Sequence, residues 1–182
     1  MKTLSSLVTL ILPLLLLVGC LPGLPVWTAG EVPYVPTPPA VVDRMLELAE
    51  IKNGDVVYDI GSGDGRIVIS AAKKYGVRGV GIEIDHDLVE RSRAQARVAG
   101  VEHLVEFRRQ DALTADLTEA TVVTLYMYPE FNAKLRPNLA KLKPGARVVS
   151  HDFGIEGWIP VKAERLPGGM LHDHTLYLWK ID

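Results

Sequence analysis

A single cysteine, Cys20, occurs among the 182 residues of the chain. Within this sequence, that excludes both an intramolecular disulfide and a cysteine-based metal cluster. An excess of positive charge is also absent, because 20 Lys and Arg residues stand against 22 Asp and Glu residues. A protein with this balance offers no broad basic surface for non-specific binding of nucleic acid. The composition therefore lowers the expectation of a nucleic-acid partner without excluding one.

Charged residues are also lacking near the N-terminus, where none follows Lys2 within the first 30 residues. The apolar run 7–18 and the Leu-Val-Gly before Cys20 resemble a bacterial lipoprotein signal, in which the cysteine carries the lipid. A membrane-spanning helix needs about 20 consecutive apolar residues, and prolines and glycines make this run shorter than that. An uncleaved membrane anchor is therefore the second alternative. A misassigned start of the chain is the third. We expect residues 1–30 to be a lipoprotein-type signal or membrane anchor with its linker. Residues 31–182 are then one domain, associated with a membrane on a side that the sequence leaves open.

The most informative pattern is Asp59-Ile-Gly-Ser-Gly-Asp-Gly65, which follows a β-branched apolar segment and precedes a helix-forming one. Glycines permit a tight turn and the close approach of a ligand to the backbone. A dinucleotide fingerprint would need glycine at position 66, where the chain has arginine, and the Asp59 carboxylate would repel a pyrophosphate. S-adenosylmethionine carries a cationic amino group and a sulfonium but no phosphate. An acidic residue beside the glycines therefore favours that cofactor.

A second acidic residue, Glu83, lies 22 residues after Gly61, at the end of another apolar segment. An acidic side chain at that place accepts hydrogen bonds from ribose hydroxyls in nucleotide-binding folds. The alternative is a glycine turn that only shapes the corner between a strand and a helix. We predict a cofactor site that contains Asp59, Gly61, Ser62, Gly63 and Glu83.

Segments of helical and strand character alternate along the rest of the chain. This alternation predicts an α/β fold with a Rossmann-like, doubly wound, seven-stranded sheet that is mostly parallel and ends in an antiparallel hairpin. Ligands of such sheets lie outside the carboxyl ends of the strands. We expect helices at 38–50, 65–75, 87–99 and 130–142, and strands at 56–60, 78–84, 104–109, 120–126, 146–150, 161–166 and 173–180.

Residues 32–39 are rich in proline and predict an extended segment before the first helix. One interpretation is a simple spacer. Another is a strap across the cofactor, with Tyr34 and Thr37 facing it. Thr37 is also a candidate N-cap of the following helix, with Pro38 in its first turn.

With Asp59, the three glycines, Glu83 and Asp111 in place, the chain resembles the class I S-adenosylmethionine-dependent methyltransferases. The resemblance implies that Asp111 receives the adenine amino group and that Tyr34 and Thr37 contact the cofactor. Residues 32–182 further resemble the archaeal broad-specificity protein-lysine methyltransferases. They are also similar to the mitochondrial enzymes that methylate lysine in the ATP synthase c-subunit and in the adenine nucleotide translocase. The residues that carry this resemblance are Val32-Pro-Tyr-Val-Pro-Thr, Tyr58-Asp-Ile-Gly-Ser-Gly-Asp-Gly-Arg-Ile, Ala120-Thr-Val-Val-Thr and Leu142-Lys-Pro-Gly-Ala-Arg-Val-Val-Ser-His, followed by Gly157-Trp158.

The resemblance implies methyl transfer from S-adenosylmethionine to lysine side chains of proteins, by in-line attack of the neutral amine. Because free lysine has a pKa of about 10.4, the site must disfavour the ammonium form, which an apolar, aromatic-lined channel does by desolvation. We expect Tyr126, Tyr128 and His151 to serve in this channel, although each is also a candidate for ordinary packing. Further candidates for the channel lining are Pro129, Phe153 and Trp158.

Other functions remain alternatives. A nucleic-acid amino-methyltransferase typically has Asn/Asp-Pro-Pro-Tyr after the fourth strand, and residues 125–129 lack it. A small-molecule methyltransferase and a non-catalytic membrane-anchored lipoprotein with this fold stay open. His172 and His174 suggest a metal, but we expect none because neither a cysteine nor a third clustered histidine supports a site. Arg66 is expected to cap or pair at its helix rather than to touch the substrate.

Overall fold

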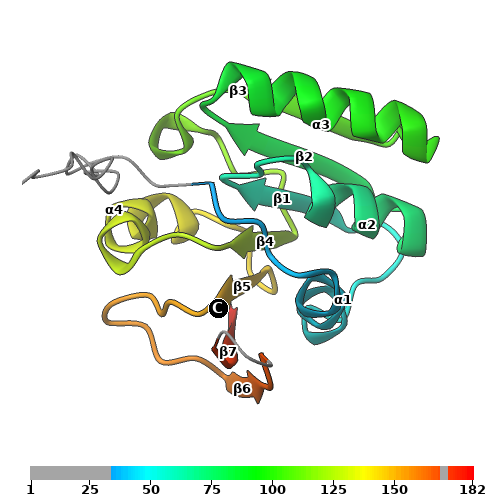
Figure 1. The fold of residues 1–182 in the computed structure, drawn as a ribbon. Coiled ribbons are helices and arrows are strands. Elements are labelled where there is room, and N and C mark those ends of the chain that lie inside the picture. Colours follow the sequence, from blue (N-terminus) through cyan, green and yellow to red (C-terminus); the bar gives the residue numbers. More distant parts are fainter. Residues whose placement is uncertain (1–33, 169–171) are drawn as a thin grey trace, which may run out of the picture. The chain divides into compact units, whose positions relative to one another are not determined.

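The computed structural model describes residues 34–168 and 172–182. In that part of the chain, four α-helices and one short 3₁₀ helix accompany seven strands (Figure 1). The strands form one sheet in the order β3-β2-β1-β4-β5-β7-β6. The elements are α1 (Pro39–Leu48), β1 (Val56–Ile60), α2 (Arg66–Tyr75), β2 (Arg78–Glu83), α3 (His86–Ala99), β3 (Val105–Arg109), η1 (Ala112–Thr114), β4 (Val122–Leu125), α4 (Pro129–Leu139), β5 (Arg147–His151), β6 (Lys162–Leu166) and β7 (His174–Lys180).

Strands β1 to β5 are parallel, whereas β7 runs antiparallel to β5 and to β6. The predicted fold class is thereby confirmed. Strand β1 lies between β2 and β4, so the strand order reverses at β1. The carboxyl ends of β1 to β5 meet at one edge of the sheet, and ligands of such folds bind outside that edge at the reversal. We call it the carboxyl edge.

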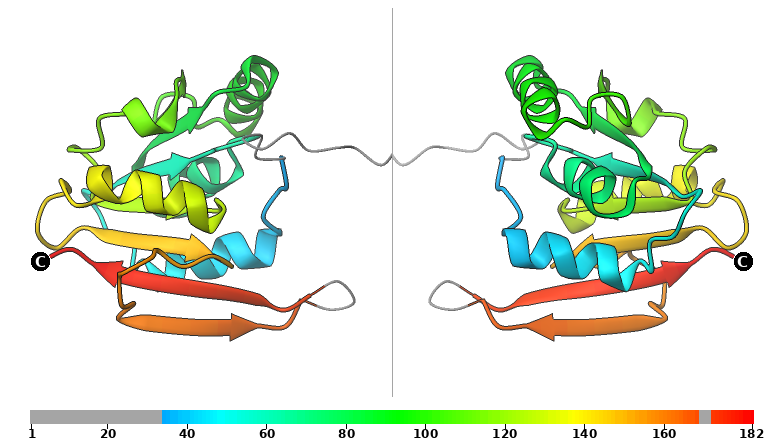
Figure 2. Two further views of the ribbon diagram at one scale, coloured as in Figure 1. Left: turned by 90° about the vertical axis from the view of Figure 1, so that its left-hand side faces the viewer. Right: turned by 90° about the vertical axis from the view of Figure 1, so that its right-hand side faces the viewer.

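Helices cover both faces of the sheet, with α1, α2 and α3 on one face and α4 on the other (Figures 1 and 2). Two groups of buried apolar side chains correspond to these two layers. All four residues of β4 are buried, as expected for a central strand of a parallel sheet that is covered on both faces. The apolar runs of the sequence thus place the carboxyl edge on a rigid framework.

The predicted element boundaries hold within a few residues. Helix α3 begins one residue before its predicted start, because the Asp85 carboxylate accepts hydrogen bonds from the backbone of Asp87 and Leu88. The N-cap interpretation of Thr37 is wrong, since Pro38 occupies the N-cap of α1 and no side chain caps that helix. The predicted leader, including Cys20, lies outside the described residues. Among the described helices, none has both the length and the apolar character needed to cross a membrane.

A buried ion pair that the sequence analysis did not predict fixes the opposite edge of the sheet. Arg147 at the start of β5 donates to the Asp55 carboxylate, and the two side chains are only 7% and 3% exposed. The same guanidinium donates to the carbonyls of Ala49 and Glu50 at the end of α1, each at 2.9 Å. It therefore joins α1, β1 and β5 far from the carboxyl edge.

Candidate cofactor and acceptor site

The glycine loop after β1 has a backbone that only glycine adopts easily. Gly61, Gly63 and Gly65 have φ angles of 68°, 54° and 80°, in the left-handed region. The amides of Gly61 and Ser62 donate to the carbonyl of Ile82 at 2.9 and 3.0 Å. The loop is thereby held against the end of β2.

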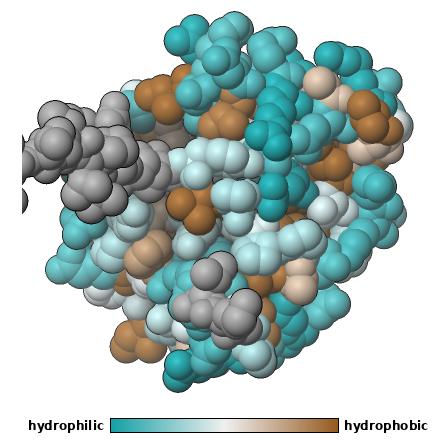
Figure 3. Space-filling view, in the orientation of Figure 1, coloured by the Kyte–Doolittle hydropathy of each residue, from teal (hydrophilic) through white to brown (hydrophobic). Residues whose placement is uncertain are grey.

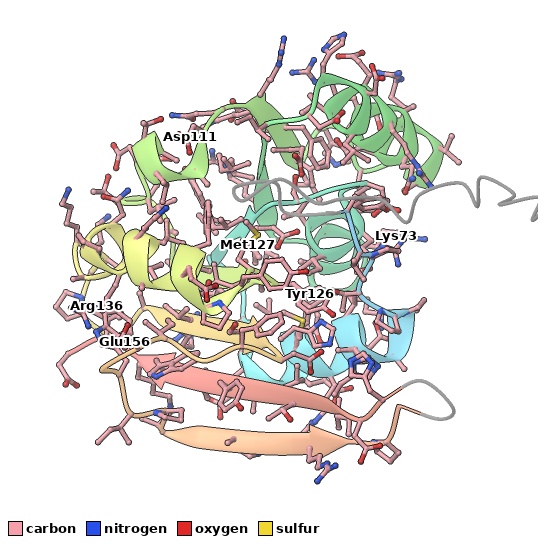
Figure 4. All side chains as sticks on the ribbon, turned by 60° about the vertical axis from the view of Figure 1, so that its left-hand side comes forward. Lys73, Asp111, Tyr126, Met127, Arg136 and Glu156 are labelled. Atoms are coloured by element: carbon pink, nitrogen blue, oxygen red, sulfur yellow. The ribbon has the colours of Figure 1, made fainter. Side chains whose placement is uncertain are left out.

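Two side chains cover this loop so closely that a Cβ atom would not fit. At Gly63, a Cβ would lie 2.6 Å from the ring of Tyr34, and at Gly61 it would lie 2.8 Å from Sδ of Met127. Tyr34 thus lies against the glycine loop, and its predicted contact with the cofactor stays a prediction. Met127 was not predicted, because a lone methionine after β4 carries no sequence signal. Figure 4 shows Met127 beside Tyr126 at the carboxyl edge.

The Glu83 carboxylate organises the loop from the end of β2. Its Oε2 accepts a hydrogen bond from the Gly63 amide at 2.8 Å, and its Oε1 accepts from Ile84 and Asp85 at 2.8 and 3.0 Å. The residue is 8% exposed. Because each carboxylate oxygen accepts about two hydrogen bonds, Oε1 is fully used and Oε2 keeps acceptor capacity for one more. A role toward ribose hydroxyls stays a prediction, and the loop contacts add a structural role that sequence reasoning missed.

Asp59 lies buried beneath the loop. Thr124 of β4 donates a hydrogen bond to its Oδ1 at 2.7 Å, and the residue is 3% exposed. Burial, together with the nearby carboxylates of Glu83 and Asp64, raises the pKa of this carboxyl to about 7, against the opposing effect of the Thr124 hydrogen bond. Asp59 forms no ion pair with any residue that the structure describes. Its position therefore suits a cationic ligand group.

Further features of the edge fit an adenosyl cofactor. The hydroxyl of Ser62 is buried and has no hydrogen-bond partner among the described residues, although nearly all buried polar groups have one. Asp111 lies exposed after β3, where its Oδ1 accepts from the Leu113 amide at 2.9 Å (Figure 4). Ile84, which follows Glu83, is 66% exposed and presents an apolar surface suited to the flat face of a base. The cofactor roles of Ser62 and Asp111 stay predictions.

Arg66 pairs as expected. Its guanidinium donates to the Asp64 carboxylate at 2.7 and 2.9 Å, and also to the backbone carbonyl of Thr37 at 2.7 Å. Thr37 itself is buried, and its Oγ1 lies 3.3 Å from Nδ1 of His151 rather than against the glycine loop. Thr37 therefore connects the strap to the last residue of β5, and a direct contact with the cofactor stays a prediction.

Aromatic side chains gather after β4 and β5. The ring of Tyr126 lies over His151 with 3.9 Å between centroids, and Phe153 packs near both Tyr126 and Tyr128. Burial and the nearby Asp152 carboxylate raise the pKa of the Tyr126 phenol. Tyr128 is 41% exposed. These side chains are brought together as predicted, and we call Tyr126, Tyr128 and Phe153 the aromatic group.

Of the other predicted channel residues, Trp158 packs against the apolar layer under α4 and Pro129 is the first residue of that helix. The loop that carries Trp158 is attached to α4, because Asn132 donates to the Gly154 carbonyl and Arg136 donates to the Glu156 carbonyl (Figure 4). These hydrogen bonds hold the loop that follows β5 against α4. The packing interpretation of Trp158 is the one that its contacts favour.

His151 is enclosed completely. Its Nδ1 faces Thr37, its Nε2 lies 2.9 Å from Nδ1 of His174, and the residue is 0% exposed. Burial lowers the pKa of His151 to about 4, against an opposing effect of Asp152. His151 is therefore a neutral imidazole with both nitrogens engaged, which favours positioning over direct handling of a substrate proton.

The premise on which a metal was excluded does not hold. His172 and His174 are joined by His151 as a third clustered histidine, and the carboxylate of Asp152 lies among them. The sequence did not reveal this, because the order in which β7 inserts beside β5 brings residues together that are more than 20 positions apart.

Comparison with known proteins gives consistent relatives. The family described as ANTKMT methyltransferase domain matches residues 59–162. A protein-lysine N-methyltransferase of Saccharolobus islandicus is 45% identical over 83% of this chain and 94% of its own length. The adenine nucleotide translocase lysine N-methyltransferase of Mus musculus is 38% identical over 72% of this chain, and this chain spans little more than half of that relative, 57%.

One similar solved structure is named for a different methyl acceptor than these relatives. The structure titled as an RNA methyltransferase from Salinibacter ruber in complex with S-adenosyl-L-homocysteine is 57% identical, with a TM-score of 0.77. The aligned region covers 81% of this chain and 94% of the chain in that structure. The fold and the cofactor chemistry of these relatives agree, whereas their names differ in the acceptor.

Proposed function

Because the chain belongs to the ANTKMT methyltransferase family and is an S-adenosylmethionine-dependent methyltransferase, we propose that it methylates lysine side chains of proteins. Two relatives named as lysine methyltransferases support this acceptor, one of them over almost its whole length. The observation that most directly supports a cofactor site here is the buried Asp59 carboxylate beneath a glycine loop that Glu83 holds in place.

The residues of the carboxyl edge fit S-adenosylmethionine group by group. Asp59 accepts the cationic amino group, Glu83 and Ser62 meet polar groups beside the glycine loop, and Asp111 receives the adenine amino group. The cofactor supplies a methyl group that is already activated by its sulfonium. What the protein then contributes is mainly alignment of the acceptor, which accounts for a large part of many enzymatic rate enhancements.

The aromatic group provides the acceptor side. Tyr126, Tyr128 and Phe153 form an apolar surface at the same edge, and burial among rings disfavours an ammonium relative to a neutral amine. The same rings attract the cation during its approach. The lysine ammonium therefore gives its proton to solvent as it enters. The neutral amine would then attack the methyl carbon in line with the carbon–sulfur bond, so that the nitrogen–carbon bond forms as that bond breaks and S-adenosylhomocysteine leaves. Figure 3 shows that apolar residues on this face lie in small separate groups among polar ones, which suits a single inserted side chain.

RNA methylation is the second candidate, and the 57% identical structure favours it. Two features of this chain weigh against it. Residues 31–182 carry 22 acidic and 19 basic residues, since Lys2 precedes them, so their net charge is about −3. The segment after β4 reads Tyr126-Met-Tyr-Pro rather than Asn/Asp-Pro-Pro-Tyr.

Attachment to a membrane through residues 1–30 is also part of the proposal, with Cys20 as the lipid-bearing residue. The support is the sequence pattern alone. Metabolic labelling with a fatty acid tests it: label in the wild-type chain and none in Cys20→Ser agrees with lipidation, whereas equal labelling contradicts it.

The acceptor is tested with purified enzyme, methyl-labelled cofactor, and either an unfolded lysine-rich protein or total RNA. Label in the protein, recovered as methyl-lysine after hydrolysis, supports the proposal. Prior acetylation of the lysines, which removes the nucleophilic amine, should remove at least nine tenths of the incorporation. Label that enters only RNA would replace the proposal by the second candidate.

A further inference from the structure

Three histidine side chains converge on one carboxylate oxygen of Asp152, where the end of β5 meets the start of β7. Measured from Oδ2 of Asp152, His172 Nε2 lies at 3.0 Å, His151 Nε2 at 3.4 Å and His174 Nδ1 at 3.7 Å. His151 Nε2 and His174 Nδ1 are 2.9 Å apart. We call these four residues the histidine cluster.

These separations are close to those of a metal site. Two ligands of a tetrahedral zinc ion, each about 2.0–2.1 Å from the metal, lie about 3.4 Å from one another. The three distances among His151, Asp152 and His174 range from 2.9 to 3.7 Å around that value. Two imidazole nitrogens that face each other at 2.9 Å share either the proton of an N–H···N hydrogen bond or a metal ion.

The protein holds these donors in place from outside the cluster. Thr37 Oγ1 lies 3.3 Å from the other ring nitrogen of His151, which leaves Nε2 as the nitrogen that faces the cluster. Asp152 has a φ of 60°, unusual for a residue other than glycine, and its second carboxylate oxygen accepts from the Thr175 amide at 2.8 Å. Such outer contacts orient metal ligands, and strained backbone gathers at ligand sites.

The burial of the ligands is also that of a built site. The side chains of His151, His174 and Asp152 are 0%, 9% and 15% exposed, whereas His172 is 54% exposed. The buried donors are two imidazoles and one carboxylate, a set that suits zinc and its neighbours among the transition metals more than magnesium or calcium. His172 lies at the open side.

We propose that His151, Asp152 and His174 bind one divalent transition-metal ion of the zinc type, with His172 as the nearest further donor. The ion takes the place of the proton between His151 and His174. It fastens the end of β5 to the start of β7 and, through His151, supports the ring of Tyr126. The proposal does not rest on lysine as the acceptor, since binding of the ion is measurable without any substrate.

Zinc titration of the full chain tests the proposal, with Cys20→Ser as the background so that the thiol does not compete. We expect one Zn²⁺ per chain and a rise in the unfolding temperature with zinc. Mg²⁺ at the same concentration should give neither, because it prefers an all-oxygen shell. Co²⁺ should give the visible absorption of a tetrahedral nitrogen and oxygen site.

Three variants make the test specific. In Asp152→Asn the new side chain has the shape of aspartate, and asparagine tolerates the left-handed backbone at this position. In His174→Gln a polar side chain is kept. Each variant should weaken Zn²⁺ binding at least 100-fold. His103→Ala, an exposed histidine outside the cluster, is the matched control and should leave the affinity unchanged. Circular dichroism establishes that the variants fold. A chain that binds less than one tenth equivalent of Zn²⁺, or folded cluster variants that bind as tightly as the background, would overturn the proposal.

Discussion

Replacement of Asp59 by Asn tests the electrostatic account of the cofactor site most closely. The carboxyl is 3% exposed and its pKa of about 7 lies far above its ordinary value of 3.8. This difference corresponds to about 4 kcal/mol. Because the folded-state pKa is the higher one, the contribution of this group to stability is complete below pH 3.8 and is lost as the pH rises to 7. Asp59→Asn should therefore be more stable than the wild type, by an amount that grows from pH 4 to pH 7 and then stays constant.

Cofactor affinity should show the opposite preference. A cationic amino group binds to the carboxylate form, so the wild-type Kd for S-adenosylhomocysteine should rise about 25-fold between pH 7.5 and pH 5.5 if the free-enzyme pKa is about 7. Asp59→Asn should bind more weakly at pH 7.5 and vary less than threefold across this range. Calorimetric titration measures the Kd, and denaturant unfolding measures the stability.

The exposed Asp111→Asn is the control, and it should keep the wild-type pH dependence. A wild-type Kd that stays constant from pH 7.5 to pH 5.5 would refute the assignment of Asp59 to the amino group. A loss of stability in Asp59→Asn at pH 7.5 would refute the argument from burial.

Glu83→Ala should weaken cofactor binding more than tenfold and also destabilise the fold by about 1–3 kcal/mol, since three backbone amides lose their acceptor. Glu83→Gln should lose less stability. An unchanged Kd in both variants would contradict the assignment of Glu83 to the cofactor site. Arg147→Met should cost about 3–5 kcal/mol in urea unfolding, because it leaves the Asp55 carboxylate buried and unpaired. Arg44→Gln breaks the ion pair with Glu164, whose two side chains are 33% and 22% exposed, and should cost less than about 1 kcal/mol. Equal losses would show that burial does not decide the cost. Tyr126→Phe should lower kcat at least fivefold, because its hydroxyl lies 3.5 Å from Asp152, with a smaller effect for Tyr128→Phe; full turnover in both would remove their hydroxyls from catalysis.

Much of the fold was predictable because it depends on local patterns. The apolar runs of β1, β2 and β4 follow from burial on both faces of a parallel sheet, and the glycines after β1 mark a turn that few other residues adopt. Asp59 and Glu83 lie at strand ends, so their convergence at the carboxyl edge follows from the topology.

What the sequence did not reveal depends on contacts between distant segments. Met127 covers Gly61, and Thr37 reaches His151, which lies 114 residues later. His151 and His174 become neighbours only because β7 inserts between β5 and β6 rather than extending the sheet in chain order. Antiparallel insertion of this kind is decided by packing of whole strands, and no local pattern specifies it.

The most direct test of protein-lysine methylation uses methyl-labelled S-adenosylmethionine and a lysate of the cells that make this protein, with the Asp59→Asn variant as a control for cofactor-dependent label. The account predicts label that resists nuclease, disappears with protease, and is recovered as methyl-lysine after acid hydrolysis. Label that resists protease and disappears with nuclease, or that is found only in small molecules, would contradict it.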